Sequence, residues 1–161
     1  MKCNYQPFFA LLRLAMTGEQ FDSVPTAEEW SEFYQMAGIQ SVTGVCYSAF
    51  SRISKEQQPP MEILMQWIGE AETIRGMNEL QNQEAARLTR LFSEQGRKTA
   101  ILKGQANARL YPDKFSRHTG DIDIWVEGGQ LASEIPFYHL KNLPNREVTD
   151  LTLETIMNDE M

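Results

Sequence analysis

Apolar side chains recur every three or four residues through much of the first part of the chain. This spacing is typical of amphipathic helices, in which such residues share one face. The first apolar stripe runs from Phe8 to Ala15, and the second follows Thr26 and Glu29, whose spacing is that of a capping box. The pattern predicts a third helix over residues 40–53.

A longer periodic stretch follows Pro60, which can occupy the first turn of a helix. Its apolar positions continue to Glu94, and Gly96 is a typical helix stop. Gly76 and the polar residues 81–84 are candidate breaks, because the stretch is longer than most helices of globular proteins. The sequence therefore predicts a helical region over residues 1–96.

The pattern changes after this region. Residues 99–102 are a short apolar run, and residues 121–126 alternate strictly between polar and apolar, as half-buried strands do. A short helical turn is predicted between them, at residues 105–110. The remainder is weakly patterned and predicts a poor helix over residues 131–140 and a further strand over residues 148–153. We therefore expect an α+β fold, with the helical region packed on a small mixed β-sheet core over residues 97–161.

Charge and composition exclude several classes of protein. The chain has 15 basic and 22 acidic side chains, a net charge of −7, and 42% hydrophobic residues, too many for a disordered chain. Duplex nucleic acid and anionic membranes are disfavoured, since both attract clustered lysine and arginine. Residues 33–51 carry no charge, but polar residues and glycines interrupt them, which argues against a membrane span. With only Cys3 and Cys46, we expect reduced thiols and a cytoplasmic protein.

The candidate chemistry lies in the alternating segment that follows Gly120. Asp121 and Asp123 are two residues apart, so in a strand both side chains project from one face while Ile122 and Ile124 turn inward. Two carboxylates held this close repel each other, and a divalent cation removes the conflict. Oxygen ligands suit Mg²⁺, which combines one or two carboxylates with substrate phosphates. Solvated aspartates on a half-exposed strand are the alternative.

A candidate phosphate-binding turn precedes this strand. Gly104 follows the first predicted strand and Gln105 opens the short helix, so a phosphate can approach the backbone closely there. Lys103 adds positive charge beside the turn. A plain glycine turn is the alternative for this segment alone. Together with Asp121 and Asp123, the turn describes the core of the nucleotidyltransferase superfamily.

The same residues resemble a bacterial family of uncharacterised nucleotidyltransferases. The motif of that family runs leucine-lysine-glycine, a short helix ending in tyrosine-proline, an arginine, and aspartate-hydrophobic-aspartate. The matching residues are Leu102-Lys103-Gly104, Tyr111-Pro112, Arg117 and Asp121-Ile122-Asp123, and the resemblance extends over residues 5–126. It implies a transferase, dependent on Mg²⁺ or Mn²⁺, that moves a nucleotidyl group from an NTP to an acceptor.

The resemblance also implies roles for individual residues. Asp121 and Asp123 would ligate the metal, and Gly104 would contact the nucleotide phosphates together with the backbone N–H of Gln105. Lys103 and Arg117 would contact phosphate or acceptor, and solvated surface cations are the alternative for both. The acidic balance of the chain favours a small molecule or a protein as acceptor over a large nucleic acid.

Two departures from the family pattern keep other functions open. Gln105 stands where many nucleotidyltransferases have serine or glycine, and the superfamily usually has a third carboxylate on a later strand. Asp150 is the candidate for that acid, with a plain surface acid as the alternative. The chain also ends early for this family, so a catalytically weak or inactive binding or regulatory module is the second hypothesis. A sugar-nucleotide glycosyltransferase is a third, disfavoured because the region before Asp121 is helical.

Overall fold

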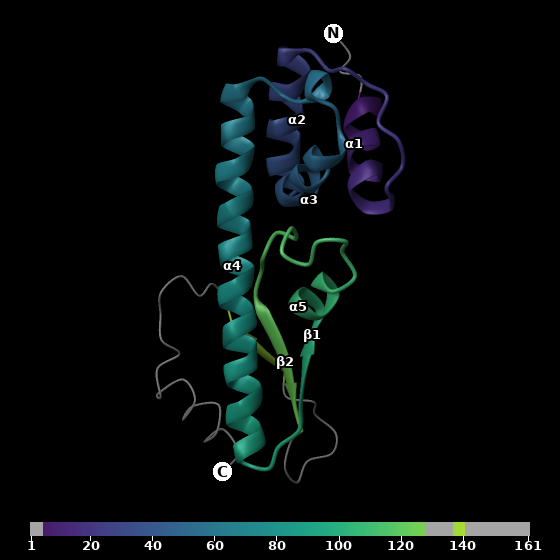
Figure 1. Ribbon diagram of the computed structural model, residues 1–161. Coiled ribbons are helices and arrows are strands. Elements are labelled where there is room, and N and C mark those ends of the chain that lie inside the picture. Colours follow the sequence, from purple (N-terminus) through teal and green to yellow (C-terminus); the bar gives the residue numbers. More distant parts are fainter. Residues whose placement is uncertain (1–4, 128–136, 141–161) are drawn as a thin grey trace.

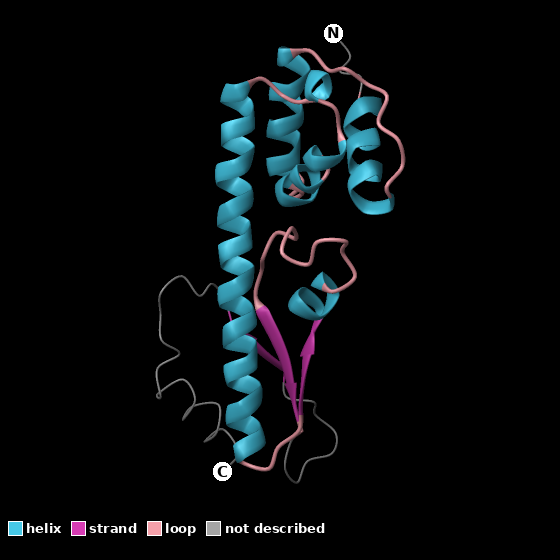
Figure 2. Ribbon diagram, viewed as in Figure 1, coloured by secondary structure: helices cyan, strands magenta, loops and turns pink. Residues whose placement is uncertain are grey.

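The computed structural model describes residues 5–127 and the backbone of residues 137–140. A group of helices comes first, and a small sheet follows it (Figures 1 and 2). In chain order the elements are α1 (Gln6–Thr17), α2 (Ala27–Ile39), α3 (Thr43–Ser48), the 3₁₀ turns η1 (Phe50–Arg52) and η2 (Lys55–Gln57), α4 (Met61–Glu94), β1 (Thr99–Leu102), α5 (Lys103–Ala108), β2 (Ile122–Val126) and β3 (Phe137–Leu140).

Helix α4 connects the two parts of the molecule. It has 34 residues, and it runs alongside α2 and α3 in its first half and alongside the sheet in its second half (Figure 1). At a rise of about 1.5 Å per residue, such a helix is about 51 Å long. The helices and the sheet are therefore placed relative to each other by one continuous element.

The helical part has an aromatic core. Trp30 and Trp67 are 0% exposed, and both pack edge-on against Phe50, with ring centroids 5.5 and 5.3 Å away. Phe8 and Phe33 extend this cluster toward α1. Edge-to-face aromatic pairs of this kind stabilise a core beyond the area they bury. The predicted apolar stripes are therefore confirmed as the buried faces of α1, α2 and α4.

Local signals in the sequence set several helix ends as predicted. Gly18 ends α1 in the left-handed conformation, at φ 79°, and its N–H is bonded to the carbonyl of Leu14. Thr26 and Glu29 form the predicted capping box at the start of α2: the Thr26 hydroxyl accepts from the Glu29 N–H, and the Glu29 carboxylate accepts from the Thr26 N–H. The capping box satisfies backbone donors that the first turn of α2 leaves free, and the Gly18 N–H satisfies a carbonyl of the last turn of α1.

The sheet packs one apolar face on the second half of α4. Ile122, Ile124 and Val126 are at most 2% exposed and form a cluster with Ala85, Leu88 and Phe92 of α4. The α+β fold and the inward turn of the two isoleucines are thus confirmed. β1 pairs antiparallel with β2, and β2 with β3, so the described sheet is antiparallel rather than mixed. The reason is that α5 and the following loop return the chain to the end of β1 that it left, without crossing the sheet.

Three predicted elements differ from the structure. α4 is not broken at Gly76 or at residues 81–84, because its buried polar side chains find hydrogen-bond partners outside the helix. The third helix is shorter than residues 40–53: α3 gives way to the 3₁₀ turn that carries Phe50 into the core. Residues 137–140 form β3, so no helix runs through them.

Other predictions about the end of the chain, the start of the poor helix and the strand over residues 148–153, lie outside the described residues. Among the helices that are described, none is both long enough and apolar enough to cross a membrane.

Candidate nucleotide-binding site

The register of the sheet brings the two halves of the predicted motif together. Leu102, the last residue of β1, is paired with Asp123 in β2. α5 begins at the next residue, Lys103, rather than at Gln105 as predicted, because the chain changes direction at Lys103, which has a positive φ. The turn that carries Gly104 is therefore the first turn of α5, and it lies directly beside the aspartates. Residues that are about twenty positions apart in the chain therefore form one local structure.

Lys103 faces Asp123 from this turn. It has φ 45°, a conformation that a residue with a side chain seldom adopts outside tight turns and functional sites. Its Nζ lies 3.7 Å from Oδ2 of Asp123, and the lysine side chain is 69% exposed whereas the aspartate side chain is 10% exposed. The lysine end of this ion pair is therefore open to solvent, whereas the carboxylate of Asp123 is nearly buried.

Gly104 lies against the backbone that leads into β2. A Cβ atom at this position would be 3.2 Å from the carbonyl oxygen of Asp121 and 4.0 Å from Nη1 of Arg117. The contact with Asp121 is tighter than side chains normally make, so a larger residue would push the turn away from the strand. Gly104 thus keeps Asp121 and Arg117 close to the start of α5.

Arg117 and Gln105 bring unused polar atoms to this turn. Arg117 Nη1 and Gln105 Oε1 are both buried without a hydrogen-bond partner. The amide nitrogen of Gln105 donates to the carbonyl of Asn78 at 3.2 Å and to Oδ1 of Asn82 at 3.1 Å, which fixes the orientation of that amide. A buried guanidinium nitrogen without a partner has unused capacity for an anion.

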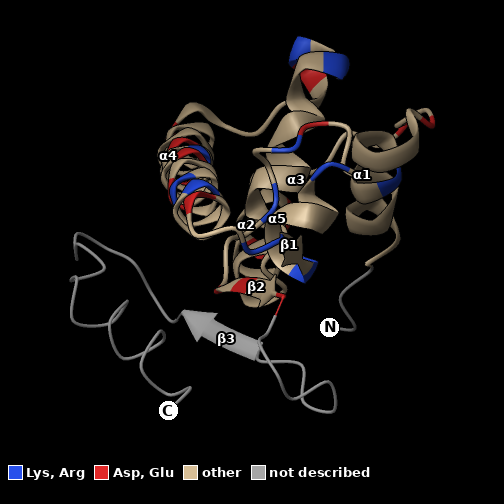
Figure 3. Ribbon diagram, turned by 90° about the horizontal axis from the view of Figure 1, so that it is seen from below, with Lys and Arg blue, Asp and Glu red and all other residues tan. Residues whose placement is uncertain are grey.

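Charge is segregated around the turn. Residues 103–118 contain Lys103, Arg109, Lys114 and Arg117 with Asp113 as the single acid, although the whole chain is acidic. In Figure 3, basic positions lie near α5 and β1, and an acidic position marks β2. A local positive field attracts anionic ligands even on a protein of negative net charge.

The structure shows no third acid beside the two aspartates within the described residues. In that part of the chain, no group of three or more His, Cys, Asp and Glu side chains forms a candidate metal site. Asp150, the predicted third acid, lies outside the described residues.

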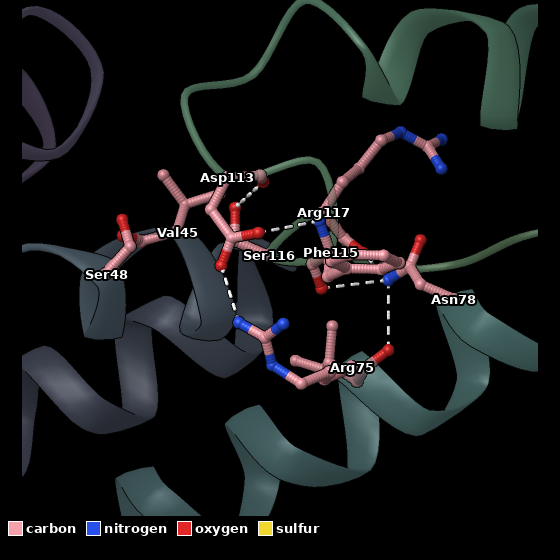
Figure 4. Close-up of polar contacts among 9 residues, drawn as sticks. Val45, Ser48, Arg75, Asn78, Asp113, Phe115, Ser116 and Arg117 are labelled. Carbon is pink, nitrogen blue, oxygen red and sulfur yellow. Dashed lines mark hydrogen bonds and ion pairs between the residues drawn. The ribbon is translucent and has the colours of Figure 1, made fainter.

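The loop before β2 is held by contacts that the sequence analysis did not find. Asp113 forms an ion pair of 2.8 Å with Arg75 of α4 and accepts from the N–H of Phe115 at 2.9 Å (Figure 4). Asn78 and Gln81 of α4 donate to carbonyl oxygens further along the loop. The detectable signal was the spacing of these three polar residues, which places them on one face of α4.

A cavity of about 480 Å³ lies on one side of this loop, between α3, η1 and α4. Arg75, Asp113 and Ser116 are among the residues that line it. The side chain of Arg117 extends away from Arg75 and Asp113 (Figure 4). Different side chains of this loop thus face the cavity and the turn at Gly104. Asp113 and Ser116 line the cavity, and Arg117 lies near the turn.

Comparison with known protein families gives a match that spans most of the described helices and strands. The model of a family described as uncharacterised nucleotidyltransferase matches residues 26–134, which include α2 to α4, the turn at Gly104 and both aspartates. The chain belongs to this family. No curated protein and no solved structure matches it. The nucleotidyltransferase family match begins at the capping box of α2, so α1 lies outside the matched range, as does Asp150.

Proposed function

We propose that this member of the nucleotidyltransferase family binds an NTP with Mg²⁺ and transfers its nucleotidyl group to an acceptor. The observation that carries the proposal is the pairing of Leu102 with Asp123, which sets the Asp-x-Asp strand beside the Gly104 turn. Family membership supports the transferase class. The dependence on a metal and the roles of single residues rest on the local geometry and on the resemblance.

Asp121 and Asp123 are the residues that would hold the ion, either Mg²⁺ or Mn²⁺. Such an ion would supply positive charge to the nucleotide phosphates and offset the negative charge that develops during phosphoryl transfer. The residues fit this role, because the nearly buried carboxylate of Asp123 lies near the start of β2, beside the Gly104 turn. Lys103, whose side chain is 69% exposed, would contact the nucleotide phosphates.

Arg117 and the Gly104 turn would bind the phosphates. Arg117 Nη1 is within reach of the turn and has no partner, so a phosphate oxygen would satisfy a buried donor. The backbone N–H of Gln105 would add a second donor, while the side chain of Gln105 stays bonded to α4. Gln105 would therefore bind phosphate through its backbone N–H, while its side-chain amide holds the turn against α4.

The acceptor would be a small molecule or a protein, activated by a third acid for which Asp150 is the candidate. The second candidate function is a binding or regulatory module without turnover. The specific observation in its favour is that the described residues provide two site carboxylates and no third. Both functions require NTP binding, and only the first requires transfer.

The proposal is tested by titrating the full chain with each NTP by calorimetry, with and without Mg²⁺. Metal-dependent binding is expected, and Asp123→Asn should weaken it by at least about a hundredfold because a metal ligand is lost. Glu127→Gln is the matched control, since Glu127 is an exposed acid just after the same strand and pairs with Lys98. Absence of NTP binding by the unmodified chain would contradict both functions.

Transfer is then measured with NTPs labelled in the α-phosphate. Incubation with small-molecule and protein fractions should move the label to an acceptor in the unmodified chain and not in Asp123→Asn. Tight metal-dependent binding without any label transfer would favour the binding module instead.

A further inference from the structure

Asn78 is a polar residue near the middle of α4, and its side chain is hydrogen-bonded to the loop that carries Arg117. It is 0% exposed. Its amide nitrogen donates to the carbonyl oxygens of Phe115 and Arg117, at 3.1 and 2.8 Å, and to that of Ile74 in its own helix at 2.9 Å (Figure 4). One side chain thus bonds two loop residues that lie 37 and 39 positions away in the chain.

Two neighbours of Asn78 extend this contact along the helix. Arg75 binds Asp113 at the start of the loop, and Gln81 donates to the carbonyl of Gly120 at its end. The three polar residues follow one face of α4 at intervals of three, and their partners follow the same order along residues 113–120. We name this set, Arg75, Asn78 and Gln81 with residues 113–120, the polar junction.

The polar junction adds little to stability, so the role of its buried side chains lies in what they position. A buried amide in a helix interior loses its hydration, and the hydrogen bonds that it gains return little more than this loss. An apolar residue at position 78 would continue the stripe of Ile74 and Ala85. The hydrogen bonds of Asn78 instead fix the direction of backbone carbonyls, which apolar contacts cannot do.

Arg117 is the residue whose position this arrangement determines most directly. Its carbonyl oxygen is held by Asn78, while its guanidinium extends toward Gly104, with Nη1 buried and unpartnered. The carbonyl of Gly120, directly before Asp121, is held by Gln81. Helix α4 therefore fixes the backbone at both ends of the segment between the phosphate-binding arginine and the first aspartate.

The structure assigns Asn78 as a positioning residue that acts on NTP binding through Arg117. This inference rests on the proposed function of the Gly104 turn. Displacement of a positioned group by about 1 Å can cost two orders of magnitude in rate or affinity. Loss of the Asn78 amide should therefore weaken binding of the nucleotide phosphates, although Asn78 itself does not touch them.

A double-mutant cycle tests this assignment. Asn78→Ala should weaken Mg²⁺-dependent NTP binding about tenfold to a hundredfold in the unmodified background, and about twofold or less when Arg117→Ala is already present. A structural role without positioning would give equal losses in both backgrounds, and this result would overturn the inference. Gln83→Ala, at an exposed position of the same helix, is the matched control and should leave binding unchanged.

Two further variants keep the test decisive if Asn78→Ala does not fold. Asn78→Ser retains one hydroxyl donor and should restore part of the binding. Asn82→Ala removes only the exposed acceptor of Gln105, and should weaken binding less than any change at Asn78. Equal affinity of Asn78→Ser and the unmodified chain would contradict a role for the two loop bonds.

A measurement without nucleotide separates this inference from the proposed function. Amide hydrogen exchange over residues 115–121 should accelerate at least about tenfold in the Asn78 variant, while exchange in α2 stays unchanged. If the unmodified chain binds no NTP and the loop still loses protection, the proposed function fails and the positioning stands. Unchanged exchange would overturn the positioning whatever the NTP result.

Discussion

Two neighbouring stretches of α4 are held in the molecule by different forces. Near its start, Trp67 lies in a core of aromatic rings, and burial of apolar surface holds the helices together. Near its middle, the polar junction binds the loop before β2 through an ion pair and hydrogen bonds to carbonyl oxygens. Apolar packing tolerates small shifts in direction, whereas hydrogen bonds to carbonyls require a defined geometry.

The aromatic core therefore mainly determines the stability of the molecule, and the polar junction mainly determines the position of the loop before β2. The aromatic core supplies most of the apolar burial in the described helices and contains no residue of the candidate site. The polar junction adds little net stability, but it determines where Arg117 and Asp121 lie. A substitution in the core should therefore lower the free energy of unfolding first, and a substitution in the junction should lower NTP binding first.

The largest effect is expected for Trp67→Ala. This side chain is 0% exposed and packs against both Tyr34 and Phe50. Removing the indole leaves a cavity, so the free energy of unfolding should fall by about 3–5 kcal/mol. Urea unfolding followed by circular dichroism measures this value. NTP affinity of the fraction that stays folded should be nearly unchanged, and a large loss there would break the comparison.

Gly44→Ala should have an intermediate effect, directed at the junction. A Cβ atom on Gly44 would overlap the carbonyl oxygen of Ser116, one residue before Arg117, so α3 or the loop must move. We expect a loss of about 1–3 kcal/mol in stability and a larger proportional loss in NTP affinity.

Gly69→Ala is the matched control for this change, since a Cβ atom there meets nothing within 4 Å. It should stabilise α4 by about 0.5–1 kcal/mol and leave NTP affinity unchanged. If Gly44→Ala lowers stability without altering affinity, the loop does not transmit displacement to Arg117.

The smallest expected effect on stability concerns Cys46, which tests whether water reaches the aromatic core. Burial raises the pKa of its thiol well above the usual range. The unfolded chain therefore releases this proton first as pH rises past about 8.5, and the free energy of unfolding should fall by about 1.4 kcal/mol between pH 7 and 9.5. Below that range this contribution is fully present. Cys46→Ala should lack this alkaline loss, and an equal loss in both proteins would show that the thiol is hydrated.

The parts of the fold that were predictable have local causes. The Thr26 capping box, the Gly18 stop, and strands β1 and β2 each depend on residues a few positions apart. The site followed partly from the same logic, because the i, i+2 spacing of Asp121 and Asp123 is local. The local pattern could not show that Leu102 pairs with Asp123, since register depends on how the intervening loop returns.

The parts that were missed depend on distant partners. Polar residues 81–84 were a candidate helix break because the periodic stretch is longer than most helices of globular proteins. The first of them, Gln81, instead stays in α4 and is hydrogen-bonded to the loop before β2. Its partner is Gly120, which lies 39 positions away in the chain. Likewise, no local sequence pattern near Phe137 predicts that residues 137–140 pair with β2.

The continuity of α4 has a consequence for how its length can vary. Each added residue rotates everything beyond it by about 100° around the helix axis. One residue inserted between Trp67 and Arg75 would leave the aromatic core in place and turn Asn78 away from the loop. Seven inserted residues would return the angle to within about 20°, at the expense of a long shift along the axis. The aromatic core and the candidate nucleotide-binding site thus keep a fixed rotation relative to each other about the α4 axis, and the number of residues between them is itself constrained.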